Sequence, residues 1–194
     1  MASNSLKLVG SMSQDIQEIL ITTEELQKRI QLLGQAISRD YLGLNPIFVG
    51  VLKGVLFFMA DLLRNTTIPV EIDFIAVANY SAEFREQGVV RMVKDLEIPI
   101  ANRHVIFVED VIDTGLTLNY ILQNLQARQP ASLNICVLFN KPDHRIIDIP
   151  LKYKGFDLPD RFVVGYGLDY KEKYRNLPFL GLLKAEIFRG GFRG

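Results

Sequence analysis

The chain has 194 residues, 48% of them hydrophobic, so it can bury one substantial core but is too short for two large domains. Its 22 lysines and arginines balance 22 aspartates and glutamates, which excludes a globally basic surface for nucleic acid or an anionic membrane. We therefore expect a single domain over residues 1–194, in which any bound anion is held by local groups.

The single cysteine and the chain start favour a cytoplasmic protein. Because Cys136 is the one cysteine, an internal disulfide is excluded. Its position in the apolar run LNICVLF predicts a buried thiol. Residues 1–20 contain no apolar segment of signal-peptide length, and nowhere do about 18 apolar residues run together. No membrane partner is expected, and RGGFRG at 189–194 is predicted to be a loose tail.

The first predicted element is an amphipathic helix over residues 22–41. Thr22 and Glu25 have the spacing of a capping box at its start. The apolar residues that follow recur at the spacing of one helix face: Leu26, Ile30, Leu33 and Ile37.

Downstream of this helix, buried strands alternate with helices. The predicted strands are residues 46–52, 70–77, 105–110, 132–139, 162–167 and 178–183, and the predicted helices are residues 55–64 and 116–126. Between them, residues 79–91 form a polar loop that returns through a short extended segment. This order indicates an α/β fold with a parallel sheet covered on both faces, whose ligands bind at the carboxyl ends of the strands.

The segment VIFVEDVIDTGLTL, residues 105–118, joins a strand to a helix and has the features of a phosphate site. At the helix start, phosphate can be bound by the amides of Asp113, Thr114, Gly115, Leu116 and Thr117, by the positive end of the helix dipole and by the two threonine hydroxyls. The sequence contains neither a GxxxxGK[ST] loop nor a GxGxxG turn. An ordinary nucleoside triphosphate or dinucleotide cradle is therefore not predicted.

Two carboxylates, Glu109 and Asp110, come just before this turn. They are poor partners for phosphate but strong acceptors for the vicinal hydroxyls of a sugar. A phosphorylated ribose would satisfy both halves of the motif. The alternative is that the acids cap the helix and face solvent.

Four ordered motifs carry a resemblance to a known family. They are VLKG at 51–54, the acidic segment at 105–118, NKP at 140–142 and PDRFVVGYGLDYKEKYRNLP at 159–178. Together they resemble the hypoxanthine-guanine branch of the type I phosphoribosyltransferases, over about residues 46–187. The resemblance implies a twisted parallel sheet flanked by helices, a small hood lobe and a flexible loop at 79–91 that closes over the site.

The resemblance also implies an activity. Members of this branch transfer the phosphoribosyl group of phosphoribosyl pyrophosphate to hypoxanthine or guanine, which yields IMP or GMP and pyrophosphate, with Mg²⁺ as cofactor. It further implies a homodimer or homotetramer. A regulatory sensor of nucleotides or phosphoribosyl pyrophosphate with the same fold, or a simpler sugar-phosphate enzyme, is the alternative.

The pyrophosphate and metal sites are carried over residue by residue. The resemblance implies that the loop at Lys53 and Gly54, with a cis peptide before the lysine in many members, binds pyrophosphate together with Arg175. It assigns Asp169, commonly through water, to Mg²⁺, with the carboxylates Glu109 and Asp110 as further metal candidates. Without the family, the lysine and glycine are an ordinary loop, and Asp169 with Arg175 a surface salt bridge.

The purine site follows in the same way. The resemblance implies that Lys141 donates to the six-oxo group, which selects against adenine, and that Phe162 stacks on the ring. The backbone at Val163 and Asp169 contacts the base edge. Without the family, Lys141 is a solvated loop residue and Phe162 a core aromatic.

Asp113 is the candidate general base or acid for the purine, with a helix cap as the alternative. In the loop, Asn79 and Tyr80 stand where family members usually carry a serine-tyrosine pair; asparagine can still donate to phosphate. His104 and His144 lie outside every motif and are interpreted as structural or surface residues.

Overall fold

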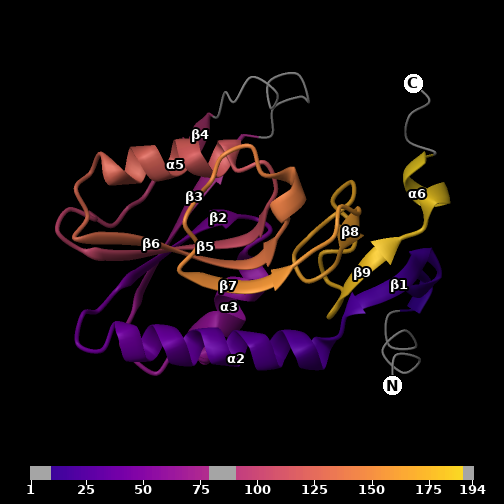
Figure 1. Ribbon diagram of the computed structural model, residues 1–194, viewed down its shortest axis with the longest axis horizontal. Coiled ribbons are helices and arrows are strands. Elements are labelled where there is room, and N and C mark those ends of the chain that lie inside the picture. Colours follow the sequence, from indigo (N-terminus) through magenta and orange to yellow (C-terminus); the bar gives the residue numbers. More distant parts are fainter. Residues whose placement is uncertain (1–9, 79–90, 190–194) are drawn as a thin grey trace. The chain divides into compact units, whose positions relative to one another are not determined.

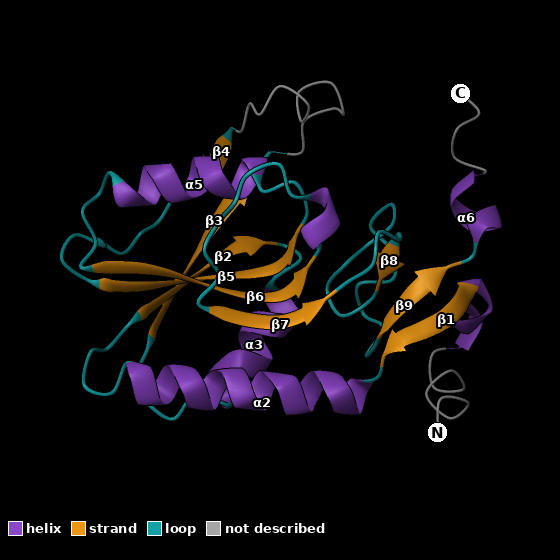
Figure 2. Ribbon diagram, viewed as in Figure 1, coloured by secondary structure: helices purple, strands orange, loops and turns teal. Residues whose placement is uncertain are grey.

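The computed structural model describes residues 10–78 and 91–189 (Figures 1 and 2). Asn79, Tyr80 and nearly all of the predicted closing loop lie outside these residues, as does the tail from Gly190 onward. The chain divides into two compact units. The smaller combines the residues up to Arg29 with those from Arg161 onward, and the larger is Ile30–Asp160.

The larger unit is built on a six-stranded sheet. Its strands, in spatial order, are β4 (Met92–Lys94), β3 (Glu71–Val77), β2 (Ile47–Leu52), β5 (His104–Ile112), β6 (Ser132–Asn140) and β7 (Tyr153–Asp157). All neighbours are parallel except β4, which runs antiparallel to β3. The strands predicted at 46–52, 70–77, 105–110 and 132–139 are confirmed, and the short extended segment after the loop is β4.

β7 is the strand of this sheet that the sequence did not predict. Its sequence YKGFD is short, places charged residues beside Tyr153 and Phe156, and lacks a clear apolar alternation. As an edge strand it has only one neighbour. Gly155 has a structural reason here: a Cβ at this position would lie 2.2 Å from the backbone oxygen of Leu138 on β6. The glycine therefore allows β7 to approach β6 closely.

Helices cover both faces of the sheet, as the α/β pattern predicts. In Figure 1, α5 (Leu116–Gln126) lies on one side, and α3 (Leu56–Arg64) and the second half of α2 (Thr23–Asp40) lie on the other. Beneath α5, buried apolar residues of the helix and sheet form one cluster that includes Phe107, Val137, Leu118, Ile121 and Leu125. None of the helices in the described ranges combines the length and apolarity needed to span a membrane.

The predicted capping box at the start of α2 is confirmed. The backbone N–H of Thr22 donates to Oε2 of Glu25 at 2.8 Å, and the N–H of Glu25 donates to Oγ1 of Thr22 at 3.3 Å. The backbone N–H and the hydroxyl of Thr22 both donate to Oε2 of Glu25, and these two hydrogen bonds hold the pKa of Glu25 below its usual value. Two donors that the first helical turn leaves without intrahelical acceptors are satisfied in this way.

The smaller unit contains a separate antiparallel sheet in the order β1 (Ile16–Ile21), β9 (Leu180–Leu183), β8 (Val163–Val164). The sequence predicted the last two strands but placed them in the parallel series, which was wrong, and it missed β1. The reason is that β1 pairs with β9 from the opposite end of the chain, a contact that no local pattern encodes. Short helical segments at Gly10–Asp15 (η1) and Ala185–Arg189 (α6) flank this sheet in sequence.

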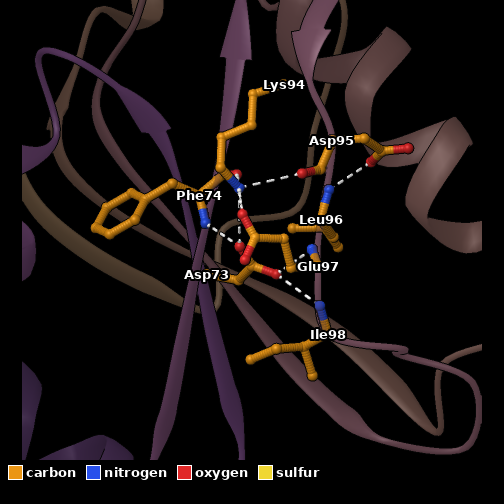
Figure 3. Close-up of polar contacts among 7 residues, drawn as sticks. All are labelled: Asp73, Phe74, Lys94, Asp95, Leu96, Glu97 and Ile98. Atoms are coloured by element: carbon orange, nitrogen blue, oxygen red, sulfur yellow. Dashed lines mark hydrogen bonds and ion pairs between the residues drawn. The ribbon is translucent and has the colours of Figure 1, made fainter.

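A buried carboxylate fixes the segment that follows β4 (Figure 3). Asp73 is 6% exposed and accepts hydrogen bonds from the backbone amides of Phe74, Glu97 and Ile98 at 2.7, 2.7 and 2.9 Å, with Lys94 Nζ at 3.4 Å. Burial by itself raises the pKa of Asp73, but these amide hydrogen bonds outweigh it and hold the pKa below its usual value. The ionised carboxylate of Asp73 therefore stabilises the folded chain.

We expect Asp73→Asn to lower the free energy of unfolding by about 2–3 kcal/mol near neutral pH, because an amide nitrogen would then face backbone donors. Since the folded-state pKa is lowered, the contribution is complete above the unfolded-state pKa of about 3.9 and is lost as the pH falls through the folded-state value. Urea unfolding of both proteins across this range should show the gap narrowing in acid.

Glu97→Gln is the matched control, because it removes an exposed charge beside Asp73 and keeps the backbone donor. Its effect should stay within about 0.5 kcal/mol. An equal loss in both variants would show that Asp73 has no special structural role.

Candidate active site

The carboxyl ends of β2, β5 and β6 meet at one edge of the sheet. Gly50 pairs with Val108, and Ile112 pairs with Asn140, so the segments that leave these strands start side by side. The amide of Lys141 continues this register by donating to the oxygen of Ile112 at 3.0 Å. The predicted site segments at 53–54, 109–117 and 141 therefore gather at this edge.

The loop after β2 lies against the second carboxylate of β5. A Cβ on Gly54 would be 1.8 Å from Oδ2 of Asp110, so only glycine leaves room for that carboxylate. The peptide bond between Leu52 and Lys53 is cis, as the resemblance implied. Asp110 is buried, and its Oδ1 accepts the backbone N–H of Val111 at 2.8 Å.

Glu109 has a buried oxygen with an unmet hydrogen-bonding need. Within the described part of the chain, its Oε2 has no hydrogen-bond partner. Burial, and then the nearby charge of Asp110, raises the pKa of Glu109 well above its usual value. Because such a group is costly, a sugar hydroxyl or a cation at this position would relieve the penalty.

A pocket of about 180 Å³ opens between the end of β5 and the start of α5. Its lining residues are Glu109, Val111, Ile112, Asp113, Thr114, Gly115, Thr117 and Leu118. The volume lies below the range of about 300–1,000 Å³ for sites that enclose a drug-sized ligand. It is suited to one end of a ligand, such as a phosphate group.

The turn before α5 depends on Gly115. Its φ of +83° is in the left-handed region, and a Cβ there would lie 3.2 Å from the side chain of Ile149. α5 begins at the next residue, and the amide of Leu116 donates to Oγ1 of Thr114 at 3.4 Å. The amide-rich helix start thus faces the pocket from the turn that the sequence predicted.

Asp113 meets a histidine that sequence reasoning left outside the site. Nδ1 of His144 lies 2.8 Å from Oδ1 of Asp113, and its Nε2 lies 2.5 Å from Oδ1 of Asp160. The available sequence signal was position alone: His144 comes three residues after Lys141, on the segment that leaves the strand next to β5.

The smaller unit carries the other predicted residues. Phe162 is 44% exposed and makes an edge-on contact with Tyr170, with ring centroids 5.6 Å apart, so it is not a core aromatic. Val163 is buried in β8.

The salt bridge considered as the alternative for Asp169 and Arg175 is present, with Nη2 of the arginine 2.7 Å from Oδ1 of the aspartate. Oδ2 of Asp169 accepts the amide of Glu172 at 2.9 Å, and Nη1 of Arg175 donates to the oxygen of Gly167 at 2.7 Å. These contacts order the loop between β8 and β9.

Comparisons with known proteins agree with this architecture. The phosphoribosyl transferase domain model matches residues 15–171. The hypoxanthine-guanine phosphoribosyltransferase of Streptococcus thermophilus (strain CNRZ 1066) is 44% identical over 177 residues, which cover 91% of this chain and 98% of that protein.

Solved structures give the same result. A hypoxanthine phosphoribosyltransferase from Staphylococcus aureus is 42% identical with a TM-score of 0.90, over 93% of this chain and 98% of its own. A hypoxanthine-guanine phosphoribosyltransferase from Bacillus anthracis is 41% identical with a TM-score of 0.84, over 87% and 99%. The chain therefore belongs to the phosphoribosyltransferase family, and within it to the hypoxanthine-guanine branch. The predicted fold class and family are confirmed.

We expect Gly54→Ala to impair activity more than stability. The new Cβ would displace the tip of the Asp110 side chain, which can rotate but then leaves its present position. The kcat/KM for nucleotide formation should fall at least about tenfold, while the melting temperature changes little.

Gly50→Ala, on the same chain segment, is the matched control, because its Cβ would meet the side chains of Met59 and Val55 at 2.9 Å and not Asp110. This variant should lose stability and keep its kcat/KM. Equal losses of kcat/KM in both variants would contradict a specific role for the clearance at Gly54.

Proposed function

We propose that the protein is a purine salvage enzyme that transfers the phosphoribosyl group of phosphoribosyl pyrophosphate to hypoxanthine or guanine, with IMP or GMP and pyrophosphate as products. The observation that carries this proposal is a pocket in which Glu109 lies beside an amide-rich helix start, with the buried carboxylate of Asp110 next to Glu109. Relatives at 44% identity named hypoxanthine-guanine phosphoribosyltransferase support the choice of purines.

The carboxylates and the helix start address different ends of one ligand. In the proposal, the 5′-phosphate binds the amides of residues 113–117 and the hydroxyls of Thr114 and Thr117. The ribose hydroxyls bind Glu109 and Asp110, which meets the need of the buried Oε2. Negative charge therefore stands beside an anion site without opposing it.

The leaving pyrophosphate is assigned to the backbone at Lys53 and Gly54 and to the guanidinium of Arg175. For Arg175 this requires exchanging part of its present contact with Asp169 for the ligand. A planar guanidinium with several donors suits either partner, so the salt bridge can hold the side chain ready.

The residues present fit a magnesium ion that arrives with its substrate. In residues 10–78 and 91–189, no group of three or more His, Cys, Asp or Glu side chains forms a metal cage. Magnesium commonly keeps waters and uses one or two carboxylates plus phosphate oxygens. Glu109, Asp110 and Asp169 can supply the carboxylates, and the substrate supplies the phosphate oxygens. The ion would neutralise charge on the pyrophosphate.

Asp113 is assigned the proton transfer. As a ring nitrogen of the purine forms its bond to the anomeric carbon, the bond from that carbon to pyrophosphate breaks and its electron pair leaves with the pyrophosphate. The proton released from the imidazole ring of the purine passes to the Asp113 carboxylate, which is 55% exposed at the pocket and open to a ligand.

The base is selected by Lys141, whose ammonium donates to the six-oxo group. Phe162 offers an exposed ring for stacking, and the backbone at Val163 and Asp169 binds the base edge. An amino group at the six position would turn a donor toward the donor of Lys141.

We also propose a cytosolic homodimer or homotetramer. Cys136 is the one cysteine of the sequence and is buried, so the chain has no internal disulfide, which suits a reducing compartment. Closed symmetric assemblies are the common state of such enzymes.

Adenine should be a poor substrate. Purified protein with Mg²⁺ and phosphoribosyl pyrophosphate is offered hypoxanthine, guanine, xanthine, adenine and uracil in parallel, and nucleotide formation is followed. We expect kcat/KM for adenine to be at least about a hundredfold below that for hypoxanthine. Efficient formation of AMP would show that Lys141 has been assigned wrongly. Binding of phosphoribosyl pyrophosphate without turnover of any base would favour the regulatory sensor.

Asp113→Asn should lower kcat by about a hundredfold or more, because the amide cannot accept the purine proton. The KM for phosphoribosyl pyrophosphate should change by less than about threefold, since the backbone amides that bind the phosphate are retained. Steady-state kinetics measure both values, and the exposed Asp148 provides a control in Asp148→Asn. An unchanged kcat would remove Asp113 from the chemistry.

A further inference from the structure

His144 joins two acidic side chains from different segments of the larger unit. It ends the short helical turn η2 (Pro142–His144) after β6. One ring nitrogen contacts Asp113 at 2.8 Å and the other contacts Asp160 at 2.5 Å. A histidine at a protein surface has no general need for two carboxylate partners, so the geometry calls for an explanation.

The backbone around His144 is fixed to the turn that carries Asp113. The amides of Ile146 and Ile147 donate to the oxygen of Thr114 at 3.0 and 3.4 Å. The side chain of Ile149 also lies over Gly115, where a Cβ on the glycine would be 3.2 Å from it. The segment that follows His144 therefore cannot move away from the turn at Thr114 and Gly115 without breaking these hydrogen bonds.

Charge supports the bridge. The hydrogen bond to Asp160, together with the charge of Asp113, raises the pKa of His144, and His144 in turn lowers the pKa of Asp160. Only the protonated ring has an N–H on both nitrogens, so only the imidazolium can donate to both acids. Asp113 and Asp160 face the two ring nitrogens. The charged residues on or next to the segment of His144 are Lys141, Asp143 and Arg145.

We propose that His144 is a positioning residue for proton transfer: its imidazolium, anchored by Asp160, holds Oδ1 of Asp113 so that Oδ2 is presented to the purine. This inference rests on the proposed function and adds His144 and Asp160 to it. A carboxylate on a half-exposed side chain would otherwise rotate, and a proton acceptor acts well only when it is held in reach of its donor.

The kinetic test compares His144→Gln and His144→Arg with the wild type. Glutamine has no charge and one amide donor group, and kcat should fall about tenfold while the KM for phosphoribosyl pyrophosphate changes by less than about twofold. Arginine keeps the charge and can donate to both acids, so kcat should recover to within about threefold of the wild type.

The pH profile separates positioning from a purely structural role. Wild-type kcat should decline as the pH rises through the raised pKa of His144, above the ordinary value of about 6.5, because the neutral ring loses one donor. This decline should be absent in His144→Gln and His144→Arg. His104→Gln is the control and should keep the wild-type profile. His104 lies at the start of β5, where its ring contacts Ser132 and Tyr41.

An NMR titration tests the bridge without any turnover. The chain has two histidines, so His104→Gln assigns both sets of ring signals. The pKa of His144 should fall in Asp160→Asn and in Asp113→Asn, and an unchanged pKa in both variants would overturn the bridge.

If the wild type is active and His144→Gln keeps its kcat and pH profile, the inference about His144 is overturned and the proposed function stands. A wild type that forms no nucleotide would overturn the proposed function, and the catalytic part of the inference with it.

Discussion

The close approach of the Gly54 backbone to the Asp110 carboxylate is the contact on which the sheet-edge site depends. It brings the loop after β2 against the end of β5 and leaves no space for any side chain between them. The parallel register of β2, β5 and β6 makes this possible, because it delivers three connecting segments to one edge. A loop and a carboxylate that are far apart in sequence thus lie against each other.

Two acids of the larger unit, Asp73 and Glu109, have buried carboxylate oxygens that differ in their hydrogen bonding. Asp73 is surrounded by three amide donors and a lysine, so both of its carboxylate oxygens have partners within the protein. Glu109 has a buried oxygen with no partner among the described residues, and its pKa is raised. A buried carboxylate whose hydrogen bonds are all made within the protein contributes to stability. A buried carboxylate oxygen without a partner would be stabilised by a ligand that donates to it.

The smaller unit holds its polar residues by local contacts. Asp169, Arg175 and the backbone of Gly167 and Glu172 tie the loop between β8 and β9 to itself. The same side chains are the ones proposed for magnesium and pyrophosphate. If that proposal holds, loop order and ligand binding use one set of donors and acceptors, and the contacts within the loop keep the guanidinium in a defined place beforehand.

The sequence by itself determined the elements whose reasons are local. The capping box at Thr22, the apolar runs of β2, β5 and β6, and the glycine turn at Gly115 follow from spacing and residue type, as does the carboxylate pair beside the turn. Only the tertiary structure decided that β1 pairs with β9 in a second sheet, that β7 forms an edge, and that His144 reaches Asp113. Each of these depends on a partner distant in the chain, and the residues involved carry no local periodicity that would reveal that partner.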